Sequence, residues 1–225
     1  MGVYKVASKA LLATLGFDER HVIKSLIDIG MSGVKTIVLL VPDWGLDDRT
    51  VKAIDTIWNI AGLTGIPRDN IIVREVTVLD PWKGVRDVMN TLYEIYLTGV
   101  DEIIVSLGGG LRALVIETYT ATLLVNPEIA RKITVRVGVE GKSDYISFRI
   151  EEIPICLRIS EQEKTVLKTI AEGVNSLSEI ARKTGLPRST TWKTLQKLYE
   201  KKIVEKKNRQ YYLTRLGETI LKLYP

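Results

Sequence analysis

Short apolar runs alternate with segments of helical periodicity over more than half of the chain. The runs are Ala10–Leu15, Lys35–Val41, Asn70–Leu79 and Glu102–Leu107. Lys35–Val41 (KTIVLLV) is apolar without a break, which is typical of a strand buried on both faces of a parallel sheet. Strands that alternate with helices form right-handed βαβ units. The alternation therefore predicts an α/β domain with a mostly parallel sheet.

The segments between and after these runs predict the helices that cover such a sheet. They are Arg20–Gly30, Asp48–Leu63, Pro81–Leu97 and Leu111–Leu124. Two later runs, Lys132–Val139 and Tyr145–Ile150, are joined by a turn signal at Gly141–Asp144, which predicts a hairpin. An antiparallel strand is therefore expected at one edge of the sheet.

The stretch Ser176–Lys202 carries two helical patterns that are separated by Gly185. Ser176 and Glu179 have the spacing of a capping box at the start of the first helix, and the second helix begins after Pro187. Two short helices joined by a glycine turn predict a helix-turn-helix. Taken alone, the stretch could also be an ordinary helical hairpin with a solvated charged face.

The sequence on either side favours the helix-turn-helix. Ser160–Glu172 is another amphipathic helix with its own capping box in Ser160 and Glu163. Downstream, Ile203–Glu205 and Gln210–Leu213 are short strands joined by a basic turn, the pattern of the wing in a winged helix. We therefore predict an α/β domain over residues 1–151, a linker over residues 152–159 and a winged helix-turn-helix domain over residues 160–225.

Charge is distributed unevenly along the chain. Residues 157–225 hold 15 of the 32 basic residues and 7 of the 27 acidic residues, so their net charge is +8 and that of the preceding residues is −3. A basic segment attached to a mildly acidic body is typical of a nucleic-acid-binding module joined to another domain.

Composition excludes several classes of protein. No apolar run reaches about 18 residues, so no membrane span is predicted, and the N-terminus lacks the pattern of a secretory signal. A single cysteine, Cys156, excludes an intramolecular disulfide. With a single histidine, His21, the chain cannot build a Cys/His metal site. We expect a cytoplasmic protein without a metal or a cofactor.

Two loops that follow predicted strands suit an anionic ligand. Thr14–Asp18 follows the first strand and Ser106–Arg112 (SLGGGLR) follows the fourth. Ligands bind at this edge of a doubly wound sheet. The glycines let backbone amides approach a ligand, the helix that begins at Leu111 directs its positive end there, and Arg112 adds a charge. The alternative is that the glycines only make a tight turn.

Motifs for nucleotide cofactors and for hydrolysis are absent. Only Gly16 follows the first strand, where a dinucleotide-binding fold needs three glycines, and no Walker A sequence is present. His21 could serve as an acid–base group or as a ligand contact, although a lone histidine there is more often a surface residue. We predict that the chain is not an enzyme.

The TLGF loop, the SLGGGLR loop and the C-terminal winged helix occur in an order that a known family shares. The chain resembles the CRISPR-associated Rossmann-fold (CARF) transcriptional regulators, the archaeal Csa type in particular, over residues 10–224. The resemblance implies a Rossmann-like CARF domain and a homodimer formed through it. It also implies a pocket for a cyclic oligoadenylate, with cyclic tetra-adenylate as the expected ring.

The resemblance places the ligand-binding residues in both loops. They are Thr14, Leu15, Gly16, Phe17, Ser106, Leu107, Gly108, Gly109, Gly110, Leu111 and Arg112. Many members of the family carry a lysine where this chain has Arg112, and a hydroxyl or amide residue where it has a third glycine. Two copies of such an amide-rich loop suit a two-fold symmetric cyclic phosphodiester.

The expected DNA partner is the double-stranded promoter DNA of CRISPR-associated genes. The second helix of the helix-turn-helix would lie in the major groove. The residues expected to face the groove are Arg188, Ser189, Thr190, Lys193 and Gln196, and those expected to contact phosphates are Lys197, Lys206, Lys207 and Arg209. Trp192 either faces the DNA or packs against the wing, and we favour packing.

Two alternatives to this function stay open. The CARF domain could also cleave cyclic tetra-adenylate slowly, as some relatives do. The chain could instead be a regulator that answers to a different small ligand or to none.

Overall fold

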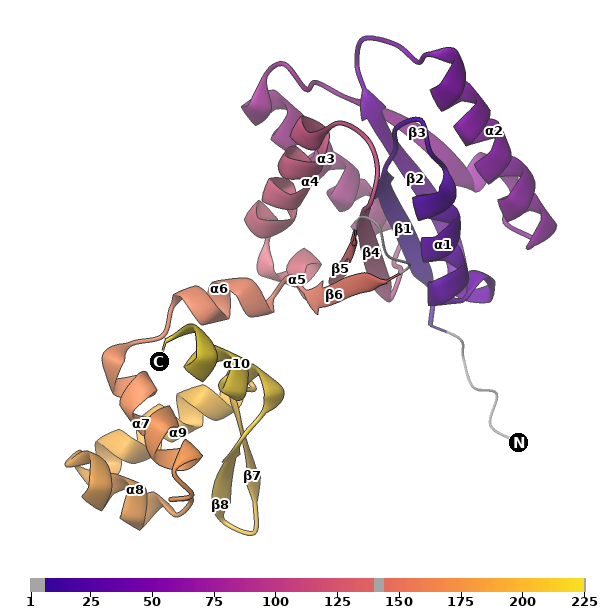
Figure 1. Cartoon of the computed structure of the whole chain (residues 1–225). Coiled ribbons are helices and arrows are strands. Elements are labelled where there is room, and N and C mark those ends of the chain that lie inside the picture. Colours follow the sequence, from indigo (N-terminus) through magenta and orange to yellow (C-terminus); the bar gives the residue numbers. More distant parts are fainter. Residues whose placement is uncertain (1–6, 140–143, 225) are drawn as a thin grey trace, which may run out of the picture. The chain divides into compact units, whose positions relative to one another are not determined.

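The computed structural model describes residues 7–139 and 144–224 of the chain. Two compact units are present, an N-terminal unit Met1–Glu151 and a C-terminal unit Glu152–Pro225 (Figure 1). Within the described residues, no helix has the length and apolar character that crossing a membrane requires.

A six-stranded sheet forms the centre of the N-terminal unit. Its strands are β1 (Lys9–Thr14), β2 (Val34–Pro42), β3 (Ile71–Val76), β4 (Glu102–Leu107), β5 (Ile133–Gly138) and β6 (Tyr145–Arg149). The order is β3-β2-β1-β4-β5-β6, and only β6 pairs antiparallel. The central strands β1 and β4 are buried almost throughout because helices cover both faces. The predicted mostly parallel sheet with an antiparallel edge is confirmed.

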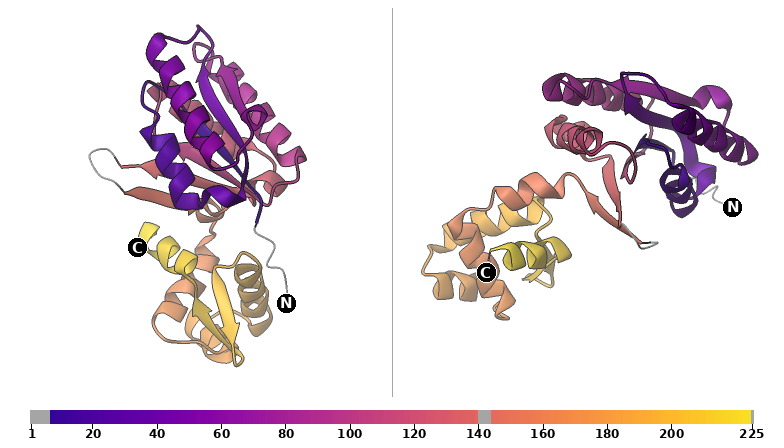
Figure 2. Two further views of the ribbon diagram at one scale, coloured as in Figure 1. Left: turned by 90° about the vertical axis from the view of Figure 1, so that its right-hand side faces the viewer. Right: turned by 45° about the horizontal axis from the view of Figure 1, so that its top comes forward.

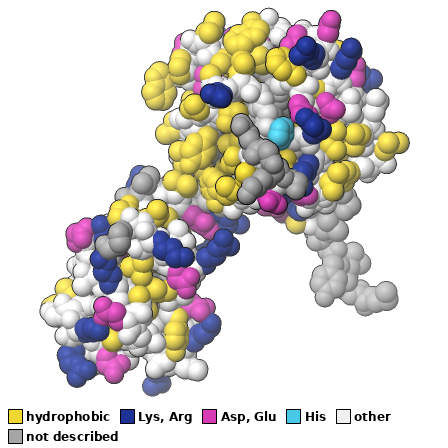
Figure 3. Space-filling view, in the orientation of Figure 1, with side chains coloured by type: hydrophobic (Ala, Val, Ile, Leu, Met, Phe, Trp, Pro, Cys, Tyr) yellow, Lys and Arg dark blue, Asp and Glu magenta, His cyan; other side chains and the backbone are white. Residues whose placement is uncertain are grey.

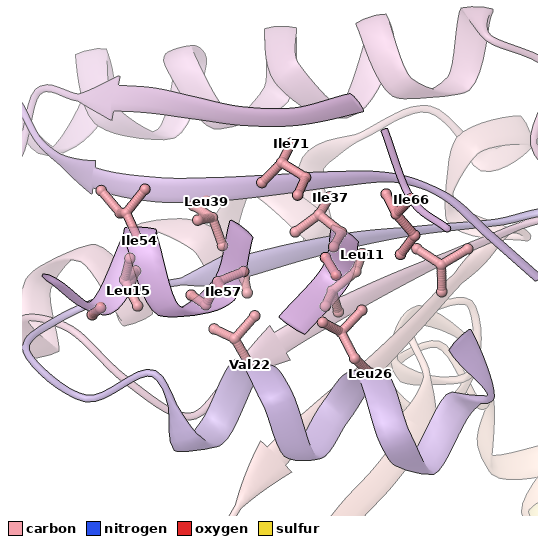
Figure 4. Close-up of a cluster of buried hydrophobic side chains, with 14 of the residues drawn as sticks. Leu11, Leu15, Val22, Leu26, Ile37, Leu39, Ile54, Ile57, Ile66 and Ile71 are labelled. Carbon is pink, nitrogen blue, oxygen red and sulfur yellow. The ribbon is translucent and has the colours of Figure 1, made fainter. Parts of the chain in front are cut away.

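Helices cover the two faces of this sheet. They are α1 (Arg20–Ile29), α2 (Asp48–Leu63), α3 (Pro81–Leu97), α4 (Arg112–Leu124) and the short α5 (Pro127–Ala130). Val22 and Leu26 of α1 pack with Ile54 and Ile57 of α2 and with inward side chains of β1 and β2 (Figure 4). On the opposite face α3 and α4 pack against each other, and α4 contacts β1, β2 and β4 (Figures 1 and 2).

The neighbouring strands β1 and β4 send the chain to opposite faces of the sheet. The loop after β1 leads to α1, and the loop after β4 leads to α4. Such a switch point opens a crevice beyond the carboxyl ends of the two strands, because their loops diverge. Both loops with the sequence features described above lie at this crevice.

In the N-terminal unit one predicted strand end differs from the structure, one helix was not predicted, and most of one predicted turn is not described. The third strand ends at Val76, not at Leu79, because the Thr77 amide donates to the Asp87 carboxylate (3.2 Å) and not to a sheet partner. The helix α5, which we did not predict, begins where the Asn126 side chain accepts from the Ile129 amide (2.9 Å). Residues 141–143 of the turn predicted between β5 and β6 lie outside the described residues.

The C-terminal unit has the order of elements predicted for a winged helix-turn-helix. Its elements are α6 (Glu152–Leu157), α7 (Glu161–Ala171), α8 (Leu177–Thr184), α9 (Arg188–Glu200), β7 (Val204–Lys207), β8 (Gln210–Leu213) and α10 (Arg215–Leu223). Its hydrophobic core combines Leu167 of α7, Ile180 of α8 and Leu195 of α9 with Tyr211 of β8 and Ile220 of α10. The hairpin is therefore held by the same core as the helices.

Residues 152–159, which we predicted as a linker, contain α6. Ile155 and Cys156 pack against the core of the C-terminal unit, and the Tyr224 hydroxyl donates to the Cys156 carbonyl (3.1 Å). An apolar segment that finds a partner surface gains more by packing than by remaining an extended connection. The boundary between the units accordingly falls between Glu151 and Glu152.

Of the two capping boxes predicted in this unit, the one at α7 forms completely and the one at α8 forms in part. Ser160 and Glu163 form the complete capping box predicted for α7. At α8 the Ser176 hydroxyl caps the Glu179 amide, but the Glu179 carboxylate accepts from that hydroxyl (2.6 Å) and not from the Ser176 amide, so only half of the predicted box forms. Gly185 then ends α8 in the left-handed region, with φ of 70°.

Candidate functional site

The loops after β1 and β4 touch through their glycines. A Cβ on Gly16 would lie 2.8 Å from the Gly110 amide nitrogen, so no side chain fits at that point. Gly110 has φ of +89°, a conformation that favours glycine, and its own Cβ would lie 2.9 Å from the Leu15 carbonyl oxygen. The glycines are therefore required by the close approach of two backbones, and not by a tight turn alone.

A pocket of about 280 Å³ opens beside this contact and is called the loop pocket below. Its walls come from three segments of the chain. They are Leu15–Asp18 after β1 with His21 of α1, Gly109–Leu111 after β4, and Trp44–Asp47 after β2 with Pro42 at the end of β2 and Thr50 of α2. The tertiary structure thus brings the two predicted loops together at one cavity and adds a third wall.

Six of the eleven predicted ligand-binding residues line the loop pocket: Leu15, Gly16, Phe17, Gly109, Gly110 and Leu111. Thr14, Ser106 and Leu107 are buried in the strands behind it. The Ser106 hydroxyl pairs with the Ser25 hydroxyl of α1 (2.8 Å), whereas the buried Thr14 hydroxyl has no partner within the described residues. The side chains of Thr14 and Ser106 therefore lie inside the fold, and that of Ser106 connects β4 to α1.

Gly108 and Arg112 also lie outside the lining of the pocket. Gly108 packs against the His21 side chain, since a Cβ there would lie 2.9 Å from His21 Cβ. Arg112 is the first residue of α4, and its side chain is exposed to solvent.

His21 contributes directly to the loop pocket, although the sequence alone favoured a surface role. Its imidazole lies over the glycine backbones at the ends of β4 and β5, because a Cβ on Gly108 or on Gly138 would lie 3.0 Å or 3.4 Å from His21 Nδ1. The Tyr145 hydroxyl donates to the His21 carbonyl (3.1 Å) and connects α1 to β6. The histidine reaches the surface in Figure 3, beside basic and acidic side chains.

Two carboxylates at the loop pocket differ in how they are paired. The hydrogen bonds that Arg20 donates to Asp18 lower the pKa of that carboxyl to about 2. Among the described residues Asp47 forms no ion pair, although the charge of Arg49 also acts on it. One of its oxygens accepts from the Arg49 and Thr50 amides at the start of α2 (2.9 Å and 2.8 Å), and the Thr50 amide lowers its pKa. Among the described residues, no group of His, Cys, Asp or Glu side chains is arranged to hold a metal ion.

Sequence reasoning missed the third wall of the loop pocket. Trp44 and Asp47 follow β2, which we read only as a strand that ends in a turn. A usable signal was present, because a tryptophan in a loop directly after a buried strand has no obvious place in the core. Trp44 is indeed 56% exposed.

A second candidate site is the outer face of α9. Arg188, Ser189, Lys193 and Gln196 are exposed there, and Thr190 is half-buried. Within the described residues, Arg188 and Lys193 have no ion pair. Four of the five residues expected to face a DNA groove are thus exposed to solvent.

The cations predicted to contact phosphates differ in their surroundings. Lys197 pairs with the buried Glu163 of α7 (3.2 Å), and Lys207 pairs with Glu205 on its own strand (2.6 Å). Lys206 lies over the Tyr211 ring, 5.4 Å from its centroid. Arg209 lies at the tip of the hairpin and has no ion pair within the part of the chain that the structure describes.

The hairpin turn itself consists of Asn208 and Arg209, with φ of 50° and 63°. Positive φ at both central residues is the geometry of a two-residue hairpin turn that matches the twist of its strands. Lys206 and Lys207 therefore belong to β7 and not to the connecting turn that the sequence suggested.

Trp192 lies on the exposed side of α9. Its side chain is 50% exposed and is absent from the hydrophobic core of the unit. The packing that we favoured for Trp192 is therefore wrong, because the core positions of α9 are taken by Thr191, Thr194, Leu195 and Leu198.

The comparisons with known proteins assign the fold of the N-terminal unit to a family. The family model of the Csa3 CRISPR-associated Rossmann-like domain matches residues 9–149. The chain belongs to this family. The family model of the HVO_A0261 N-terminal domain matches residues 152–224. No curated protein matches the chain.

Solved structures with a similar fold are distant in sequence. The protein VC1899 from Vibrio cholerae is 10% identical with a TM-score of 0.38; the match covers 96% of this chain and 63% of that chain. Csm6 from Enterococcus italicus, bound to cyclic hexa-2′-fluoro-hexa-dAMP, is 12% identical with a TM-score of 0.48, and the match covers 86% of this chain and 55% of that one. The chain thus spans less than two thirds of the length of both proteins.

Proposed function

We propose that the chain is a dimeric transcription regulator of CRISPR-associated genes that binds a cyclic oligoadenylate at the loop pocket and double-stranded DNA through α9 and the β7–β8 hairpin. The observation that carries the proposal is the contact between the Gly16 and Gly110 backbones at the switch point of a CRISPR-associated Rossmann-like domain. Exposed backbone amides at such a point suit phosphate groups.

The helix starts at the loop pocket support an anionic ligand. The starts of α2 and α3 are capped by the side chains of Asp47 and Asp80. The N-cap residues of α1 and α4, which follow the two glycine loops, make no side-chain cap. At α1, however, the Asp18 carboxylate accepts from the Arg20 amide (3.0 Å), so only the start of α4 is without a side-chain acceptor among the described residues. Uncapped amides at a helix start are unsatisfied donors and carry the positive end of the helix dipole. The start of α4 therefore presents donors where the phosphates of a cyclic ligand would lie.

The apolar surface of α3 and α4 supports a dimer. Ile116 and Leu124 of α4 are 64% and 53% exposed, and Trp82 and Leu97 of α3 are 75% and 64% exposed. Hydrophobic side chains gather over these helices in Figure 3. A soluble protein rarely exposes so many large apolar side chains on one face without a partner. A second copy would also bring a second Arg112 to the ligand.

The charge of the C-terminal unit supports DNA as its partner. The exposed cations of α9 and the hairpin tip lie on a segment whose net charge is +8 for residues 157–225. Hydroxyl, amide and cationic side chains on one helix face can contact both base edges and phosphates. In a dimer, a ligand at the loop pocket would alter operator affinity by shifting the placement of the two α9 helices.

An electrophoretic mobility-shift assay on DNA that flanks CRISPR-associated genes tests the whole proposal. We expect cyclic tetra-adenylate to change the apparent DNA affinity by about fivefold or more, the scale of a modest allosteric coupling. Identical binding curves with and without the ring, in a protein that binds the ring by calorimetry, would refute the coupling.

The assignment of α9 has its own test with a matched control. The Lys193→Ala, Gln196→Ala variant should bind the promoter DNA more weakly, because it loses a phosphate or base contact from each position. Lys168→Ala removes an exposed cation from α7 and should bind like the wild type. Equal affinity of all three proteins at physiological salt would remove α9 from the interface.

A second candidate function is slow cleavage of the bound ring. His21 favours it, because its imidazole lies at the wall of the loop pocket and is a side chain of the kind that transfers protons in catalysis. Incubation with cyclic tetra-adenylate followed by chromatography tests for linear products. We expect little or no turnover. If turnover is found and persists in His21→Ala, His21 does not transfer the proton and the cleavage depends on positioning of the ring alone.

A further inference from the structure

The loop pocket has two walls of different chemistry. The wall of Gly16, Gly109 and Gly110 is made of backbone. The rest of the lining includes the side chains of Phe17, Trp44, Leu46 and Asp47, called the side-chain wall below. The proposed function uses the backbone wall for phosphates and leaves the side-chain wall without a role.

The aromatic side chains of this wall are exposed in a way that core packing does not explain. Phe17 is 61% and Trp44 is 56% exposed, and both lie in loops that follow the neighbouring parallel strands β1 and β2. The Arg49 guanidinium lies over the Phe17 ring, 5.9 Å from its centroid, and adds a positive charge on that side. Exposed aromatic rings beside positive charge are the surfaces on which proteins stack nucleobases.

Asp47 supplies a hydrogen-bond acceptor beside these rings. The Arg49 and Thr50 amides both donate to Oδ1. The Thr50 side chain and the charge of Arg49 also stabilise the ionised carboxylate. Neither backbone amide donates to Oδ2, the oxygen that we assign to a donor from the ligand. A carboxylate accepts from an exocyclic amino group such as that of adenine, and it repels phosphate. The wall therefore suits a base and not a second phosphate.

The size of the loop pocket limits what enters it. A volume of about 280 Å³ lies just below the range for pockets that enclose a drug-sized molecule, so it holds about one nucleoside. A ring of four nucleotides is too large for it. A cyclic ligand at the glycine loops would therefore lie mostly outside the pocket and insert a single base.

We propose that Phe17, Trp44 and Asp47 form a subsite for one adenine base of the ligand, with the base stacked on the aromatic rings and its amino group donating to Asp47. This subsite deepens the proposed function and rests on it for the identity of the whole ligand. It makes Trp44 and Asp47 specificity-determining residues, while the glycine loops bind the backbone of the ligand.

Titration calorimetry of the full chain with cyclic tetra-adenylate tests the stacking. Trp44→Ala should weaken binding by about fivefold or more, the scale of one stacked base. Trp44→Phe keeps an aromatic ring and should remain close to the wild type. Trp192→Ala, which removes an equally exposed tryptophan from the C-terminal unit, should leave ring binding unchanged.

A pair of mononucleotides tests the contact with the amino group. Wild type should bind adenosine 5′-monophosphate about tenfold more tightly than purine riboside 5′-monophosphate, which lacks the amino group. Asp47→Asn should bind the two equally, because it loses the anionic acceptor. Asparagine caps a helix as well as aspartate does, so α2 stays folded in this variant.

The outcomes separate the subsite from the proposed function. If the wild type, Trp44→Ala and Asp47→Asn bind the ring equally, the subsite is wrong and the ring remains the ligand. If the wild type binds adenosine 5′-monophosphate through Trp44 and Asp47 but does not bind the ring, the subsite stands and the proposed ligand is wrong. Binding of neither the ring nor the mononucleotide overturns both.

Discussion

Replacement of Glu163 by glutamine should destabilise the C-terminal unit. The Glu163 carboxylate is 2% exposed, and it accepts from the Ser160 amide and hydroxyl (both 2.8 Å) and from Lys201 Nζ (2.9 Å). Lys197 Nζ of α9 lies 3.2 Å away, and Lys201 directly follows the end of that helix. Glutamine keeps the shape and one acceptor oxygen, but it leaves the ammonium groups of Lys197 and Lys201 without their carboxylate.

The pKa of Glu163 sets the size and the pH dependence of this effect. Burial alone would raise that pKa, but the Ser160 amide, the Lys201 ammonium, the Ser160 hydroxyl and the Lys197 ammonium hold it at about 2, below the ordinary 4.5. At about 1.4 kcal/mol per pKa unit, the ionised group contributes about 3 kcal/mol to the free energy of unfolding. Because the folded pKa lies below the unfolded one, this contribution is complete above pH 4.5 and is lost as the pH falls towards 2.

Fluorine NMR of protein labelled with 5-fluorotryptophan can follow the unfolding, because Trp192 is the only tryptophan of the C-terminal unit. At neutral pH the urea midpoint of the Trp192 signal should fall by about 2 M or more in Glu163→Gln, for a slope of about 1 kcal/mol per M. Glu161→Gln, whose carboxylate is exposed and pairs with Lys164 (2.6 Å), should change the midpoint little. An equal loss in both variants, or a Glu163→Gln deficit that persists at pH 2, would refute the reasoning.

Three further outcomes follow from the N-terminal unit. Burial raises the pKa of the Glu117 carboxyl in the folded unit. The unfolded chain therefore loses that proton at a lower pH, and the folded unit should lose stability as the pH rises above the ordinary carboxyl range. Glu117→Gln should abolish that loss in calorimetric scans from acid to neutral pH. Gly16→Ala should abolish binding of cyclic tetra-adenylate in calorimetry, because its Cβ would lie 2.8 Å from the Gly110 nitrogen, whereas Gly62→Ala, with nothing within 4 Å, should bind normally. Ile116→Lys should sediment as a monomer, whereas Ile27→Lys, similarly exposed on α1, should remain a dimer; sedimentation of both variants as the wild type would remove α4 from the interface.

Local signals in the sequence determined most of the elements of this fold. The bounds of α2, α3 and β4 are those predicted, because Asp47 and Pro81 mark helix starts and β4 is a short, mostly apolar run that Gly108 ends. The alternation of strands and helices was sufficient for a mostly parallel sheet, since such strands must be covered on both faces. Gly185 and the helices on either side of it were likewise readable, because a glycine in the left-handed region ends a helix locally.

The prediction failed or stopped where a residue's role depends on a distant partner. The apolar residues of 152–159 indicate burial, but not that the core of the C-terminal unit would receive them. The sequence shows Lys197 only as a basic residue on the outer face of a helix. In the structure it pairs with Glu163 of α7. Ser106 was expected to contact the ligand, but its hydroxyl pairs with the Ser25 hydroxyl of α1.

The loop pocket shows the same division most clearly. The sequence alone determined that two glycine loops follow buried strands and that backbone amides would be exposed there. Only the strand order β3-β2-β1-β4-β5-β6 decided that the loop after β2 lies beside them and adds Trp44 and Asp47 to the cavity. An apolar pattern records that a strand is buried but not which strand it pairs with, because pairing depends on contacts between residues far apart in the chain.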